Sequence, residues 1–176
     1  MSHTWGDDEV TFEDMKNLHI AKKRKGYIKI RKTCERARQE GINLAWVDPC
    51  CIDKSSSAEL SELINSMFLW YKLPIVCYAW LEDWDGLDSR SLRRSRWFTR
   101  GWTLQELIAP PEVQLLNHDW KYCGSRGSLG DTVSTVSGVD VEVLEGRQPL
   151  SNVSDFRCNF FLLWPYLGSP NKDGLP

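Results

Sequence analysis

No segment of this 176-residue chain is long and apolar enough to cross a membrane as a helix, since a span needs about 20 consecutive apolar residues. The first ten residues, MSHTWGDDEV, lack the basic start and the apolar centre of a signal peptide. The formal net charge is only −2, so no global field favours nucleic acid or an anionic membrane. We therefore expect a cytoplasmic protein that binds neither a membrane nor nucleic acid.

The chain also lacks a C-x-x-C pair, although it has six cysteines. Structural zinc sites normally use such spacing, so the sequence predicts no metal site. Without a signal peptide, the cysteines are expected to be reduced thiols rather than disulfides. Two of them, Cys50 and Cys51, are neighbours.

The composition is that of a folded globular protein, with 41% hydrophobic and 26% charged residues. The length suits one domain with a substantial core. Nine tryptophans favour a fold with large aromatic anchors over a disordered chain.

Helical and strand patterns alternate along most of the chain. Gly41 follows the first helical pattern, at residues 27–40, and is a residue that commonly ends a helix. The amphipathic segments that predict helices are residues 27–40, 56–71, 97–108 and, more weakly, 128–137. The apolar runs that predict strands are residues 42–48, 75–81 and 112–117. This alternation is typical of an α/β domain with a parallel sheet and flanking helices.

Ligands of such sheets collect at the carboxyl ends of the strands. The loops expected there are DPCCIDKSSS after residues 42–48 and EDWDG after residues 75–81. SHTWGDDE would be the first such loop, but only Met1 precedes it. We therefore expect the first strand to be truncated.

Three motifs carry a family resemblance: SHTWGDDEVTFEDM (2–15), WVDPCCIDKSSSAELSELINSMFLWY (46–71) and SRWFTRGWTLQELIAP (95–110). Their order and spacing closely resemble the fungal heterokaryon-incompatibility (HET) domain family. The resemblance implies a HET domain over residues 1–154, incomplete at its N-terminus, followed by a divergent tail over 155–176. Family members regulate programmed cell death after fusion of genetically unlike fungal cells. The implied role is non-self recognition similar to innate immunity, with self-association or other incompatibility proteins as partners.

The HET domain is in turn similar to Toll/interleukin-receptor (TIR) domains, which have a flavodoxin-like fold. Plant TIR domains carry a WCL-x-EL helix whose glutamate is catalytic in NAD cleavage. WTLQEL matches that helix here and places Glu106 on the catalytic carboxylate. The resemblance therefore implies a TIR-like, flavodoxin-like sheet and makes NAD a candidate substrate; no cofactor is expected.

Cleavage of the glycosidic bond of NAD passes through an oxocarbenium-like transition state, which a nearby negative charge stabilises. Glu106 would supply that charge, and Trp102 would wall the pocket or stack on a ring. Arg96 and Arg100 would pair with the pyrophosphate. The alternative is that Glu106 pairs with Arg100 or Arg96 on the surface and that Trp102 belongs to the core.

Further candidate substrate-binding residues lie in the loops at the expected ligand edge: His3, Trp5, Gly6, Asp48 and Cys51. His3 is either a general base or a hydrogen-bonded structural group. Gly6 would allow a tight turn, and Asp48 would end a strand at the pocket. Cys51 is either a thiol nucleophile with His3 as its base or a small core hydrophobe.

Three functional readings stay open at this point. Glu106 in WTLQEL favours an NAD-cleaving enzyme. The lack of a Gly-rich phosphate loop and of a complete acid/base pair favours a non-enzymatic death-signalling module that self-associates. An inactive gene fragment is the third. The run SRSLRRSR (89–96) is interpreted as a solvated, salt-bridged loop rather than a phosphate-binding patch.

Overall fold

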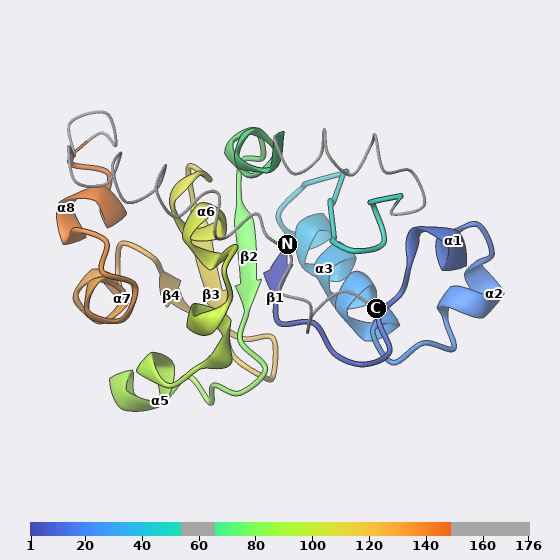
Figure 1. Cartoon of the computed structure of the whole chain (residues 1–176), viewed down its shortest axis with the longest axis horizontal. Coiled ribbons are helices and arrows are strands. Elements are labelled where there is room, and N and C mark those ends of the chain that lie inside the picture. The colour runs from blue at the N-terminus through green and yellow to red at the C-terminus, as the bar shows by residue number, and fades with distance from the viewer. Residues whose placement is uncertain (54–65, 149–176) are drawn as a thin grey trace.

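The computed structural model describes residues 1–53 and 66–148 (Figure 1). The expected helix start at 56–65 and the expected tail at 155–176 lie outside the described residues. Residues 66–72, the end of that expected helix, are helical. Among the described residues, no helix is long and apolar enough to pass through a membrane.

A four-stranded sheet in the order β1–β2–β3–β4 forms the centre of the fold. Its strands are β1 (Ser2–His3), β2 (Cys77–Trp80), β3 (Val113–Leu116) and β4 (Tyr122–Ser125). β1, β2 and β3 run parallel, with Ser2 opposite Ala79 and Cys77 opposite Val113. β4 pairs with β3 in the antiparallel direction.

Helices lie on both sides of this sheet (Figure 1). Besides the helix at 66–72, they are α1 (Phe12–Met15), α2 (Leu18–Ala21), α3 (Tyr27–Gln39), α5 (Ser89–Arg93), the 3-10 helix η1 (Arg96–Thr99), α6 (Thr103–Ile108), α7 (Gly130–Ser137) and α8 (Val141–Leu144). In Figure 1, α1 and α2 lie beyond α3, farther from the sheet. The predicted α/β class is therefore confirmed.

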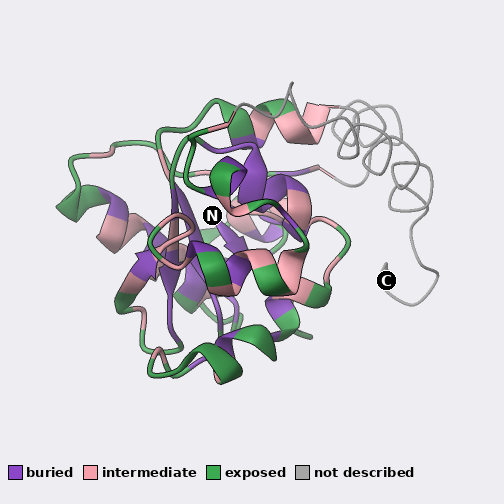
Figure 2. Cartoon of the chain, turned by 90° about the vertical axis from the view of Figure 1, so that its left-hand side faces the viewer, coloured by how far each residue is buried: buried purple, intermediate pink, exposed green. Residues whose placement is uncertain are grey.

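Alternate residues of β2 enter two separate hydrophobic cores, because successive side chains of a strand point to opposite faces. Cys77 and Ala79 pack in the core beneath α6, α7 and α8. Tyr78 and Trp80 pack in the core beneath α2 and α3. All four residues are buried, which explains why this strand is continuously apolar in sequence. Figure 2 shows the buried residues concentrated on the strands and on the inner sides of the helices.

α3 confirms the predicted amphipathic helix, and Gly41 follows it with a φ of 74°. That left-handed conformation suits glycine and ends the helix. The buried residues of α3 are Lys29, Thr33 and Ala37, so a lysine lies on the inner side of the helix. The sequence pattern did not indicate that charge.

The strand expected at residues 42–48 is wrong: residues 42–47 form no strand. The segment does run near β1, because the amino group of Met1 donates a 2.8 Å hydrogen bond to the carbonyl oxygen of Trp46. A strand needs a ladder partner, and β1 consists only of Ser2 and His3, so its edge away from β2 is too short for a regular ladder. The first strand of the sheet was expected before the SHTWG motif. It is instead formed by Ser2 and His3, the first two residues of the motif.

The predicted parallel sheet is present in β1, β2 and β3, and the antiparallel β4 makes the four-stranded sheet mixed. The sequence of β4, YCGS, has no apolar run, and its four residues include only one that is fully buried. The register shifts between Leu115 and Leu116. Strand formation here depends on the neighbouring β3 edge, which local sequence does not reveal.

Candidate functional site

Glu106 lies on α6 with only 3% of its surface exposed. The single helix expected across residues 97–108 is divided into η1 and α6. The hydroxyl of Thr103 donates to the carbonyl oxygen of Trp97 and joins the two pieces. This break places Arg100 beside Glu106, whereas in a continuous helix their separation of six residues would put Arg100 about 1.7 turns away.

Four hydrogen bonds hold the Glu106 carboxylate. Arg100 donates two of them, from Nη1 to Oε2 at 2.7 Å and from Nη2 to Oε1 at 3.0 Å. Ser2 Oγ donates to Oε2 at 2.6 Å, and the Tyr71 hydroxyl donates to Oε1 at 3.1 Å. Parallel, charge-assisted bonds of this kind are among the strongest in proteins.

The carboxylate of Glu106 is ionised in this setting. Burial alone would raise its pKa, but the charge of Arg100 and the hydrogen bonds from Arg100, Ser2 and Tyr71 outweigh burial and lower the pKa below its ordinary value. The site therefore holds a fixed negative charge inside the protein, neutralised by one guanidinium.

A second layer of side chains orients the partners of Glu106. Trp97 donates from its indole nitrogen to Ser2 Oγ at 2.6 Å, which directs the Ser2 proton toward the carboxylate. Tyr71 is buried and packs edge-on against Trp46, with ring centroids 5.5 Å apart. Burial and the Glu106 charge raise the pKa of Tyr71, so its hydroxyl remains a donor.

The other residues predicted on this helix lie at different depths. The side chain of Arg100 is 19% exposed, against 5% for Glu106, so the arginine is the more accessible partner. Trp102 is half-buried. Arg96 is 63% exposed and pairs with Glu82 and Asp83. The pairing of Glu106 with Arg100 that the sequence offered as an alternative is present, but it is buried.

A second carboxylate, that of the partly buried Glu9, lies against the next residue of β1. His3 Nε2 is 3.6 Å from Glu9 Oε1. The Lys29 ammonium donates to Glu9 and, at 3.0 Å, to the carbonyl oxygen of Thr4. The backbone N–H of Gly6 donates to Glu9 Oε1 at 2.8 Å.

These contacts and burial shift the pKa values of Glu9 and His3. Burial raises the pKa of Glu9, but the neighbouring His3 ring and the hydrogen bonds from Lys29 and Gly6 outweigh it and lower the pKa to about 2. Burial lowers the pKa of His3, against the opposing effect of the Glu9 carboxylate 3.6 Å away. Sequence reasoning missed Glu9 and Lys29, because the local pattern does not show that Lys29 lies on the inner side of α3.

The structure does not bring all the predicted site residues together. Ser2 and His3 are adjacent in β1 but join separate clusters, one with Glu106 and one with Glu9. Within residues 1–53 and 66–148, the recorded partners of Cys51 are Val47 and Cys50 and do not include His3. Trp5 and Asp48 are half-buried.

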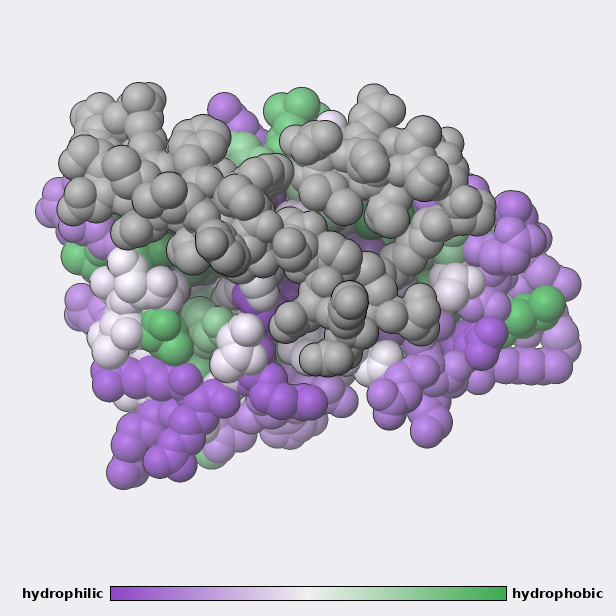
Figure 3. Space-filling model, in the orientation of Figure 1, coloured by the Kyte–Doolittle hydropathy of each residue, from purple (hydrophilic) through white to green (hydrophobic). Residues whose placement is uncertain are grey.

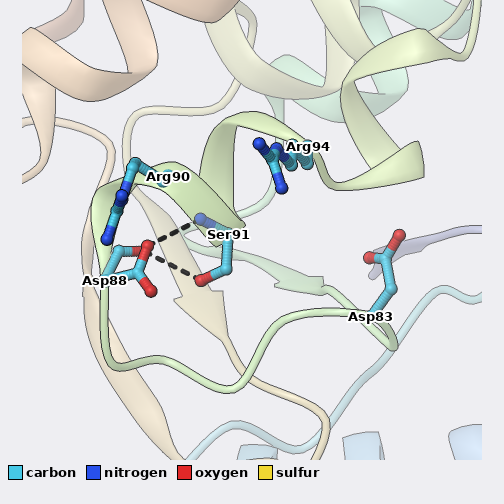
Figure 4. A pocket seen from close by; sticks show the side chains of 5 residues that line it. All are labelled: Asp83, Asp88, Arg90, Ser91 and Arg94. Atoms are coloured by element: carbon cyan, nitrogen blue, oxygen red, sulfur yellow. Dashed lines mark hydrogen bonds between the residues drawn. The ribbon is translucent and has the colours of Figure 1, made fainter.

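A cavity of about 370 Å³ lies elsewhere, in the loop after β2 and along α5. Its lining residues are Asp83, Asp88, Arg90, Ser91 and Arg94 (Figure 4). Asp88 accepts from the backbone N–H of Ser91 at 2.7 Å and so begins α5. Asp83 accepts from Ser95 Oγ and from the backbone N–H of Arg96.

This cavity contains none of the predicted site residues. The loop that carries it does follow a parallel strand, where ligands of α/β sheets collect. The surface over α5 is strongly hydrophilic, at the lower left of Figure 3. The two carboxylates that line the cavity already accept hydrogen bonds from backbone N–H or hydroxyl groups of the chain. Their main role is therefore to stabilise the loop.

In the part of the chain that the structure describes, no group of three or more His, Cys, Asp or Glu side chains could hold a metal ion.

Comparison with known proteins gives a family and one curated relative. The family described as heterokaryon incompatibility protein (HET) matches residues 1–90. The vegetative incompatibility protein HET-E-1 of Podospora anserina is 42% identical, in a match that covers 93% of this chain and 12% of the relative. No solved structure matches the chain, so the TIR-like character of the fold stays a prediction.

Proposed function

The chain belongs to the heterokaryon incompatibility protein (HET) family, and from this premise we propose that it acts in fungal heterokaryon incompatibility. The 42% identity to a vegetative incompatibility protein supports the proposal. Because this chain spans only 12% of that relative, the proposal concerns what the HET segment itself contributes. That contribution is non-self recognition leading to programmed cell death in the cytoplasm, through self-association or other incompatibility proteins.

The biochemical activity we propose is hydrolysis of the nicotinamide–ribose bond of NAD, with Glu106 as the catalytic carboxylate. The observation that carries it is an ionised carboxylate fixed inside the fold. As the bond between nicotinamide and ribose breaks, positive charge develops on the ribose, and a fixed negative charge stabilises it. Water then adds to the ribose, and the products are nicotinamide, ADP-ribose and a proton.

Access to Glu106 in this mechanism requires Arg100 to move. The guanidinium is the more exposed partner, so it can turn outward and leave Oε1 and Oε2 to the ribose hydroxyls. An arginine released in this way suits the pyrophosphate, which it can bind through two parallel hydrogen bonds. Trp102, half-buried at the start of α6, would wall the same pocket.

One observation favours a second function, a non-enzymatic death-signalling module. Both oxygens of Glu106 are already occupied by donors from the chain itself, and the side chain is 5% exposed. In that case Glu106 ties β1, the helix at 66–72 and α6 together, and it contacts no substrate.

The experiment must separate loss of chemistry from loss of folding. Glu106→Gln keeps the shape of the side chain, and the double variant Arg100→Met/Glu106→Leu replaces a buried ion pair with apolar groups, which proteins often tolerate. Glu112→Gln is the matched control, because Glu112 is exposed in the loop between α6 and β3. Circular dichroism establishes folding of each protein before NAD consumption and toxicity in a fungal host are measured.

NAD turnover by the wild type and by Glu112→Gln, abolished in the folded Glu106→Gln and double variants, is the expected result. We expect toxicity to be lost in the same variants. A folded wild type without turnover, whose toxicity survives in the double variant, would refute NAD cleavage and establish the module.

A further inference from the structure

Two adjacent thiols, Cys50 and Cys51, lie in the turn that follows residues 42–47. Their Sγ atoms are 3.9 Å apart. Cys51 is exposed and Cys50 is buried. An exposed thiol next to a buried second thiol is the arrangement of redox-sensing cysteines, in which one sulfur reacts and the other resolves the product.

Val47 gives the two sulfurs different roles through its backbone. Its N–H donates to Cys51 Sγ at 3.4 Å, which stabilises a negative sulfur. Its carbonyl oxygen accepts from the Cys50 thiol at 3.2 Å, which requires Cys50 to keep its proton. The same turn is closed by the backbone N–H of Cys51, which donates to the Val47 carbonyl at 3.1 Å.

The pKa values of the two thiols are shifted in opposite directions, in agreement with these hydrogen bonds. The hydrogen bond with Cys50 and the one from Val47 lower the pKa of Cys51, against the opposing effect of partial burial. The hydrogen bond with Cys51 and burial raise the pKa of Cys50. Cys51 is therefore the thiolate of the pair, and the thiolate is the form that reacts.

We propose that Cys50 and Cys51 form a redox-active dithiol, which hydroperoxides oxidise to a vicinal disulfide. This dithiol is independent of the proposed NAD cleavage, because the contacts of its two sulfurs that support it are with Val47 and with each other, not with Glu106.

The reaction has two steps. In the first, the Cys51 thiolate attacks one oxygen of the hydroperoxide; an S–O bond forms, the O–O bond breaks, and the other oxygen leaves as an alcohol, or as water from hydrogen peroxide, after taking a proton. In the second, Cys50 Sγ attacks the Cys51 sulfenic sulfur; the S–S bond forms and hydroxide leaves with the Cys50 proton as water. The dithiol loses two electrons and two protons, and the peroxide is reduced.

The disulfide would change the turn. Its sulfurs must approach from 3.9 Å to about 2.05 Å, so both hydrogen bonds to Val47 are lost. Trp46 precedes Val47 and packs against Tyr71, so the turn is next to an aromatic contact of the larger core. Oxidation is thus expected to be visible in tryptophan fluorescence.

The test exposes the reduced full chain to equimolar hydrogen peroxide at pH 7, blocks the remaining thiols, and identifies each cysteine by peptide mass spectrometry. Cys123 is the internal reference, because burial raises its pKa. We expect the peptide with both neighbouring cysteines to lose two hydrogens, about tenfold faster than Cys123 is oxidised, since an ordinary thiol is only a few per cent thiolate at neutral pH.

Three variants define the roles. Cys50→Ser should accumulate a sulfenic acid at Cys51 that dimedone traps, and Cys51→Ser should show no fast oxidation. Cys123→Ser should behave as the wild type. Oxidation of Cys51 no faster than Cys123, or a disulfide from Cys51 to Cys34 or to a second chain, would overturn the proposal.

A second measurement on the wild type avoids any loss of folding in the variants. Phenylarsine oxide binds two close thiols at one arsenic, so one equivalent should protect both Cys50 and Cys51 from alkylation, with reversal by a small dithiol. Alkylation of either cysteine at the unprotected rate would show that the two sulfurs cannot act together.

Discussion

Single residues of β1 contact two carboxylates, the buried Glu106 and the partly buried Glu9. Ser2 and His3 point to opposite faces of the sheet, as successive residues of a strand do. Ser2 donates to Glu106, and His3 lies against Glu9. Removing a carboxylate from water is costly unless it is paired and hydrogen-bonded. Glu106 is paired with Arg100, and Glu9 is paired with Lys29.

Removal of one member of the Arg100–Glu106 pair should be strongly destabilising. Glu106→Ala leaves the guanidinium of Arg100 buried without its counterion, so we expect the free energy of unfolding to fall by about 3–5 kcal/mol. The double variant Arg100→Met/Glu106→Leu should recover most of that loss, because it leaves no unpaired charge. Urea denaturation measures both values.

Arg31→Ala is the control for this prediction, because Arg31 is 52% exposed and pairs with Glu35 on the surface of α3. Its expected cost is below about 0.5 kcal/mol. A Glu106→Ala loss as small as that of Arg31→Ala would show that the buried pair contributes nothing to folding.

At the scale of elements, one arginine joins the end of α6 to α8. The Arg126 guanidinium donates to the carbonyl oxygens of Leu107 at 2.7 Å and Pro110 at 2.8 Å. It also donates to the carbonyl oxygens of Pro111 at 3.0 Å and Leu144 at 3.2 Å. The last carbonyls of a helix have no partner within the helix, so Arg126 supplies the donors that α6 lacks.

Arg126→Gln should therefore loosen this junction. The glutamine is too short to reach all four carbonyls, and hydrogen bonds to charged groups each contribute about 1.5–3 kcal/mol. We expect a loss of about 2–3 kcal/mol in thermal or urea unfolding. Arg147→Gln is the control, because Arg147 is exposed and pairs with Glu142; it should change the free energy of unfolding little. Equal effects of the two substitutions would contradict this role of Arg126.

The whole molecule should lose stability in acid, because folding lowers the pKa values of Glu9 and His3. The pKa of Glu9 is about 2 in the folded protein and about 4.3 in an unfolded chain, so its contribution is complete above pH 4.5 and is lost as the pH falls toward 2. The pKa of His3 is lowered from 6.5, chiefly by burial. Its contribution is complete above pH 6.5 and is lost below, because the unfolded state binds the proton first.

The melting temperature should accordingly fall as the pH is lowered from about 7 to 3. His3→Gln should remove the part of this fall between about pH 7 and 5, since Lys29 and Arg100 both oppose a charge at His3. His118→Gln is the control, because that side chain is 48% exposed. An unchanged pH profile in His3→Gln would refute this account.

The arrangement of the whole fold was only partly predictable. Periodicity identified α3 with its end at Gly41, and the continuous apolar run identified β2, because both patterns reflect burial of the element's own side chains. β4 and the unpaired segment at 42–47 were mispredicted, since pairing depends on a neighbouring strand that local sequence does not contain. The sequence also singled out Glu106 and offered Arg100 as its partner.

By itself, then, the sequence determined the α/β class, the HET family and the carboxylate in WTLQEL, because motifs and periodicity are local properties. Only the tertiary structure decided that Glu106 is buried and shared among Arg100, Ser2 and Tyr71. Those residues come from separate segments, and their meeting depends on how β1, the helix at 66–72 and α6 pack. The same holds for Glu9 with Lys29, because a charged pair twenty residues apart leaves no periodic signal.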